Sequence, residues 1–165
     1  MSHGPLLWCL LAAALFGAST PASKVLLDDV GALTLAGLLY LGAGLFSAPF
    51  ARRGDQPDGG WGKRNLWLLG GAVFFGGVLG PIAMLYGVRL APASTSALWL
   101  NLETPTTAVL GVLFFREHLS RRGWLGVVVV AAASVLLATP ERFARAPAAA
   151  RLFAACVCWG LDNHF

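Results

Sequence analysis

The sequence predicts an all-α protein, a polytopic bundle of transmembrane helices. Of its 165 residues, 57% are apolar and only 12% are charged, whereas roughly 25% of the residues of a soluble domain are charged. The apolar residues gather in long runs, and an apolar helix needs about 20 residues to cross a bilayer. Short polar clusters separate these runs. So few charges cannot cover a soluble domain of this size, so we expect an integral membrane protein.

Five apolar runs predict five complete spans: Leu6 to Val25, Val30 to Phe50, Leu66 to Val88, Ala91 to Phe115 and Trp124 to Ala138. The first run is expected to stay in the protein as a span, because the residues before it include no Lys or Arg, which a signal peptide would carry. Asp28 and Asp29 mark a turn, and the Gly-, Pro- and Asp-containing stretch 52–64 predicts a flexible loop.

A sixth run begins near Ala148 and is still short of a full span at Phe165, so we expect a truncated sixth span. The predicted organisation is a repeat over 6–138, a loop over 139–147 and the start of a second repeat over 148–165.

The basic residues of the loops predict that the N-terminus is cytoplasmic, because cytoplasmic loops carry an excess of Lys and Arg. One side would hold Arg52, Arg53, Lys63, Arg64, Arg116, Arg121 and Arg122, and the other Lys24, Arg89, Arg142, Arg145 and Arg151. The net charge of +4 is explained by such loops. No basic stripe accompanies it, so nucleic acid is not an expected partner.

Glu103 lies near the middle of the fourth run, where a charge costs at least about 2.5–3.5 kcal/mol on insertion scales. Helical spacing places Ser96, Trp99, Thr106, Thr107 and Leu110 on the same side of the helix. Pro105 has no N–H, so it frees the carbonyl of Asn101 and predicts a kink. Two interpretations remain open: a polar site at midplane depth, or a carboxylic acid that hydrogen-bonds to a neighbouring helix.

Gly76 and Gly80 have the small-xxx-small spacing that favours close helix packing. The three cysteines are expected to be packing residues, and the three histidines do not form a metal cluster. Neither a metal, a cofactor nor a catalytic constellation is predicted, so we do not expect an enzyme.

Two segments 143 positions apart align, which is the offset that a five-span repeat predicts. They are Leu10–Thr20 (LLAAALFGAST) and Phe153–Asn163 (FAACVCWGLDN). An odd number of spans in each repeat inverts the second copy, as in many transporters.

Several motifs resemble the EamA family of the drug/metabolite transporter superfamily, whose members carry ten spans in two five-span repeats. They are Ala14–Lys24 (ALFGASTPASK), Leu98–Glu103 (LWLNLE) with Phe114–Leu119 (FFREHL), Gly123–Gly126 (GWLG) leading into Val135–Ala138 (VLLA), and Cys158–Asn163 (CWGLDN). One departure is that Thr104 stands where the family commonly has its proline, and Pro105 follows it.

The resemblance implies a secondary transporter in a bacterial-type cytoplasmic membrane that moves small metabolites or drugs by alternating access, coupled to an ion gradient. Glu103 would be its midplane proton or substrate group. The remaining pathway residues would be Trp99, Thr106 and Thr107 on the same face, Asp162 and Asn163 on the opposing wall, and Ser19 and Thr20 as their repeat-related counterparts.

The expected partners are the lipid bilayer, a small-molecule substrate, and the second repeat or a second copy of the chain. The competing hypothesis is a membrane assembly or structural fragment that transports nothing and packs with another chain. Glu117 is expected to form a structural ion pair beside Arg116 and Arg121.

Overall fold

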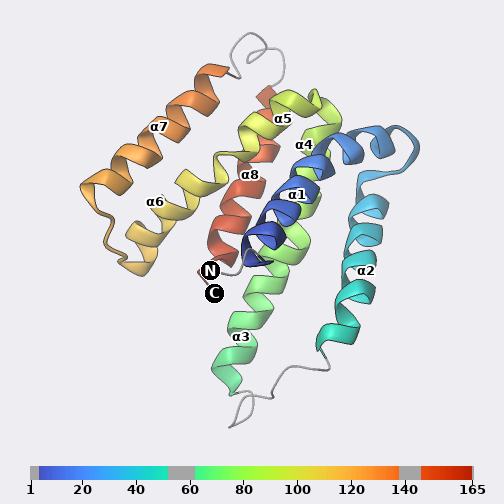
Figure 1. Ribbon diagram of the computed structural model, residues 1–165, viewed down its shortest axis with the longest axis horizontal. Helices are drawn as coiled ribbons and strands as arrows, with labels where there is room; N and C mark the ends of the chain where they lie inside the picture. Colours follow the sequence, from blue (N-terminus) through green and yellow to red (C-terminus); the bar gives the residue numbers. More distant parts are fainter. Residues whose placement is uncertain (1–3, 52–61, 138–145, 165) are drawn as a thin grey trace.

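The computed structural model describes residues 4–51, 62–137 and 146–164, and every element in these ranges is a helix (Figure 1). This confirms the all-α prediction. The elements are α1 (Gly4–Asp29), α2 (Ala32–Ala51), α3 (Lys63–Ala72), the π-helix η1 (Val73–Leu79), α4 (Gly80–Leu90), α5 (Ala93–Leu100), α6 (Glu103–Phe115), α7 (Arg121–Leu137) and α8 (Ala146–Asp162).

Within the described residues, four helical segments are long and apolar enough to cross a membrane, whereas the sequence predicts five complete spans. They are Gly4–Asp29, Ala32–Phe50, Lys63–Leu90 and Ala93–Phe115. The fifth predicted span corresponds to α7, which has 17 described residues and is therefore short of the about 20 that a bilayer requires. The predicted loops fall largely on residues 52–61 and 138–145, outside the described residues.

The first turn lies two residues later than predicted. Helix α1 continues through Asp28 and Asp29, and the chain turns at Val30 and Gly31. Lys24 therefore sits inside a helix rather than in a loop. Its ammonium donates to the carbonyls of Val88 at 2.9 Å and Arg89 at 2.8 Å. A cation is favourable there because the last carbonyls of a helix have no intrahelical donor and carry a partial negative charge.

Helix α8 lies between α4 and α6 and contacts both, together with η1 and α5 (Figure 1). Its inward residues are fully covered: Ala148, Leu152, Ala155, Cys156 and Gly160. Leu152 belongs to the apolar core with Leu85 and Val88 of α4. The helix that begins the expected second repeat is thus packed among the helices of the first.

Three glycines on one face of the α3–η1–α4 segment let α8 approach closely. A Cβ at Gly87 would meet Leu152, one at Gly80 would meet Trp159, and one at Gly76 would meet Asp162. The partners run in opposite directions along the two helices, so the contacts define one antiparallel register. Gly76 and Gly80 were expected to pack helices together, and Gly87 extends the same face.

Large apolar side chains cover the outer surfaces. Trp8, Phe16, Phe46 and Trp67 are 69–83% exposed, an arrangement that costs little where lipid rather than water surrounds the helices. This surface fits an integral membrane protein.

Candidate functional site

The π-helix η1 leaves the carbonyl of Gly76 without a donor from its own helix. In an α-helix the N–H of Gly80 would bond to Gly76, but it donates to the carbonyl of Phe75 instead. The next residue along the chain is Pro81, which has no N–H to offer. Such π-helical turns occur mostly as single-turn insertions and frequently at functional sites.

Two aromatic side chains take the place of the missing donor. The hydroxyl of Tyr40 on α2 donates to the Gly76 carbonyl at 3.1 Å, and the indole Nε1 of Trp159 on α8 donates to it at 3.2 Å. One backbone oxygen therefore connects η1 with two other helices.

The carboxylate of Asp162 lies against the backbone of Gly76, where a Cβ would clash with it. It interacts electrostatically with Tyr40 and with Glu103. Gly76 is at the middle of the Lys63–Leu90 segment, so the antiparallel register places Asp162 near mid-membrane depth. Glu103, also near the middle of its segment, approaches it from α6.

Glu103 is the first residue of α6, and its half-buried side chain interacts with Asn163. The helical segment Ala93–Phe115, in which a kink was expected around Pro105, is interrupted by a turn at Asn101 and Leu102 that divides it into α5 and α6. The Leu102 N–H donates to the carbonyl of Trp99 at 3.0 Å. A carboxylate in the first turn of a helix is favoured by the partial positive charge of the N-terminus.

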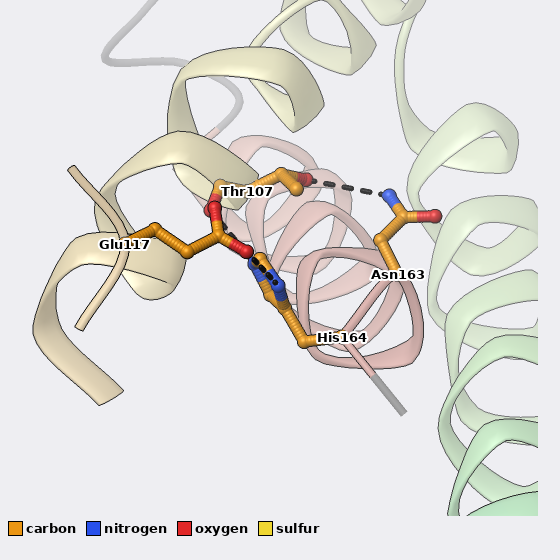
Figure 2. Close-up of polar contacts among 4 residues, drawn as sticks. All are labelled: Thr107, Glu117, Asn163 and His164. Atoms are coloured by element: carbon orange, nitrogen blue, oxygen red, sulfur yellow. Dashed lines mark hydrogen bonds and ion pairs between the residues drawn. The ribbon is translucent and has the colours of Figure 1, made fainter. Parts of the chain in front are cut away.

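A second set of polar contacts joins the end of α8 to α6 (Figure 2). Asn163 Nδ2 lies 3.5 Å from the Thr107 hydroxyl, and His164 Nε2 lies 3.1 Å from the Thr107 carbonyl. The imidazole of His164 is also 3.5 Å from the carboxylate of Glu117 and stacks on Phe115. Glu117 thus pairs with His164, not with the neighbouring arginines that the sequence pointed to.

The other predicted pathway residues are spread over several places. Ser19 donates to the carbonyl of Phe16 in its own helix at 2.6 Å, and Thr20 is buried. Trp99 packs against the apolar core. Thr106 lines an apolar groove of about 340 Å³ between α6, α7 and α8. The structure therefore brings together Glu103, Thr107, Asp162 and Asn163, and it leaves Ser19, Thr20, Trp99 and Thr106 outside that group.

Ser19 lines a different groove, of about 310 Å³, between α1, α2, α4 and α8. Its walls include the aromatic rings of Phe16, Tyr40 and Trp159. Tyr40 and Trp159 also bond to the Gly76 carbonyl, so this wall of the groove is tied to the turn against which Asp162 lies, although Asp162 itself does not line the groove.

Sequence reasoning missed Tyr40, Trp159 and His164 as site residues. Tyr40 carried a usable signal, because it is a hydrogen-bonding side chain at the middle of the apolar run from Val30 to Phe50. Gly80–Pro81 carried another, since a proline following glycines in the middle of a span disturbs the backbone.

In the part of the chain that the structure describes, neither Glu103 nor Asp162 pairs with a lysine or arginine, and no three metal-binding side chains cluster. Two carboxylates that share a low-dielectric site repel each other. A proton or a cation between them removes that repulsion.

Comparison with known proteins gives two matches. The model of the EamA-like transporter family matches residues 4–139. An uncharacterized transporter of Methanothermobacter thermautotrophicus is 26% identical over 140 residues, which cover 78% of this chain and 41% of the relative. The chain thus spans less than half the length of that curated relative. No solved structure matches.

Proposed function

Because the chain belongs to the EamA-like transporter family, we propose that it forms part of a secondary transporter for small metabolites or drugs. In this proposal the transporter works by alternating access and is coupled to an ion gradient. The bilayer and the remaining part of the transporter, either a second repeat or a second copy, are its partners.

The observation that carries the proposal is the pair of carboxylates at mid-span. Asp162 at the end of α8 lies against Gly76. The next residue, Asn163, reaches Thr107 and Glu103 on α6, so the two carboxylates lie near each other. An intramembrane acid normally marks an ion or substrate path. A proton or a positively charged group that binds there relieves the repulsion between them, and its departure restores it. Occupancy of this point therefore depends on the concentration of protons or cations on the side of the membrane to which it is open.

Two breaks in helical geometry flank the carboxylates and support a moving site. One is the turn at Asn101 and Leu102, immediately before Glu103, and the other is η1, against Asp162. Interrupted helices at mid-membrane depth are typical of transporter binding sites. In this mechanism α6 and the half of the long segment after η1 tilt about these points.

We further propose that the protein lies in a bacterial-type cytoplasmic membrane with its N-terminus in the cytoplasm. The support is the distribution of basic residues in the sequence, including Lys63, Arg64, Arg121 and Arg122 near the helix ends on that side.

The test is Glu103→Gln in the full chain, reconstituted in proteoliposomes that contain a trapped pH-sensitive dye. The unchanged protein should move protons when a pool of candidate metabolites is added, and Glu103→Gln should lower that flux at least about tenfold. The matched control is Asp28→Asn, which neutralises an exposed acid at the end of α1 and should leave the flux intact.

Two results would count against the proposal. Normal coupled flux in Glu103→Gln would remove this carboxylate from the mechanism. A well-folded chain that moves no solute would instead favour a membrane protein with an assembly or structural role.

A further inference from the structure

The groove between α1, α2, α4 and α8 has walls made largely of aromatic and aliphatic groups. Phe16, Tyr40 and Trp159 reach it from three different helices, and Pro81 and Met84 complete the surface. Its volume of about 310 Å³ is at the small end of the range for ligand pockets. It fits a small molecule with one ring.

Three of the four side-chain hydrogen-bond donors that line the groove are already engaged, Ser23 being the fourth. The Tyr40 hydroxyl and the Trp159 indole N–H both donate to the Gly76 carbonyl. The Ser19 hydroxyl donates to the carbonyl of Phe16. What these groups still offer to a ligand is oxygen lone pairs and ring faces. A ligand that needs donors, such as a carboxylate or a phosphate, finds few here.

None of the residues that line the groove is charged. A carboxylate lies behind its wall, because Asp162 sits against Gly76, whose carbonyl accepts hydrogen bonds from both Tyr40 and Trp159. Asp162 in turn interacts with Glu103. Aromatic faces attract cations, most strongly where water is excluded. The three rings and the nearby carboxylate therefore both favour a positively charged ligand.

We propose that this groove binds an organic cation with an apolar or aromatic body, with the rings of Phe16, Tyr40 and Trp159 around it and Asp162 as its counter-charge. The identification of this groove as a substrate site rests on the transport function proposed above, and it names the chemical class of the substrate.

The test uses three probes that share one body and differ in charge: phenethylammonium, 2-phenylethanol and phenylacetate. Their binding to the purified full chain in detergent is measured by isothermal titration calorimetry. Phenethylammonium should bind at least about tenfold more tightly than the other two. Equal affinity for the alcohol would show an unselective apolar crevice, and tighter binding of phenylacetate would reverse the assigned charge. Either result overturns the proposal.

Two variants link the binding to this groove. Asp162→Asn keeps the shape of the side chain and should weaken phenethylammonium binding about tenfold while the affinity for 2-phenylethanol stays the same. Phe16→Leu removes a ring that is 69% exposed. It should lower the affinity for phenethylammonium severalfold without a folding defect. Asp29→Asn, an exposed acid at the end of α1, is the matched control and should bind normally. Unchanged cation affinity in both Asp162→Asn and Phe16→Leu overturns the proposal.

Binding and transport fail separately in these experiments. A chain that moves protons with another solute in proteoliposomes but does not bind phenethylammonium overturns the groove assignment alone. A chain that binds the cation in an Asp162-dependent manner but moves no solute supports the groove and overturns the transport proposal.

Discussion

Replacing Gly80 with alanine tests whether α8 packs against the α3–η1–α4 segment as the structure describes. A Cβ at this position would lie 2.6 Å from Nε1 and 2.9 Å from Cδ1 of Trp159, which is too close for any real contact. The indole ring would have to move, and its hydrogen bond to the Gly76 carbonyl would be lost.

The size of the effect follows from three contributions. Overpacking a tight contact costs about 1–3 kcal/mol. The lost hydrogen bond adds about 0.5–1.5 kcal/mol. Alanine in place of glycine within a helix returns about 1 kcal/mol. We therefore expect a net loss of about 0.5–3.5 kcal/mol in the free energy of unfolding. In a chain of this size each kcal/mol lowers Tm by about 2–4 °C.

The measurement is thermal unfolding of the purified full chain in detergent. Gly70→Ala is the matched control, because Gly70 belongs to the same long segment and a Cβ there meets nothing within 4 Å. It should be neutral or slightly stabilising. In a Trp159→Leu background the smaller side chain leaves room, so Gly80→Ala should cost less than in the original chain. Equal Tm values for Gly80→Ala and Gly70→Ala would refute the described packing.

Two further substitutions probe contacts elsewhere in the fold. Lys24→Met should destabilise the protein by about 1–2 kcal/mol, because it removes charge-assisted hydrogen bonds at the end of α4. Its control in the same unfolding assay is Lys63→Met, which changes an exposed lysine at the start of α3. Equal effects of the two substitutions would contradict the capping role of Lys24. Tyr40→Phe should lower the free energy of unfolding by only about 0.5–1.5 kcal/mol, because Trp159 still donates to the Gly76 carbonyl. The double variant with Trp159→Phe leaves that carbonyl unpaired and should be destabilised by more than the sum of the two single substitutions. Strictly additive effects would argue against a shared acceptor.

The membrane class and the helical fold follow from the sequence because they depend on composition and on the length of apolar runs. The carboxylate at Glu103 could be singled out for the same reason, since the cost of burying a charge depends on depth rather than on detailed contacts. The spacing of Gly76 and Gly80 likewise marks a packing face without knowledge of the partner helix.

The contacts across helices could not be predicted in this way. Nothing local to Glu117 indicates that its partner is His164, because the two side chains meet only through the packing of α8 against α6. Gly111 makes this contact possible, since a Cβ there would meet both side chains. The π-helix was also missed, because apolar periodicity does not register a single inserted residue in a run that is apolar on every side.

The central position of α8 has a consequence for biosynthesis. Its residues are made after those of α4, yet α4 carries two glycines, Gly80 and Gly87, whose contacts are with α8. Helices inserted earlier therefore cannot complete their packing in the order in which they are made. The first helices must therefore stay in the bilayer with the glycine face of α4 uncovered until α8 packs onto it, so the interior of this bundle is filled by a helix made after the helices that surround it.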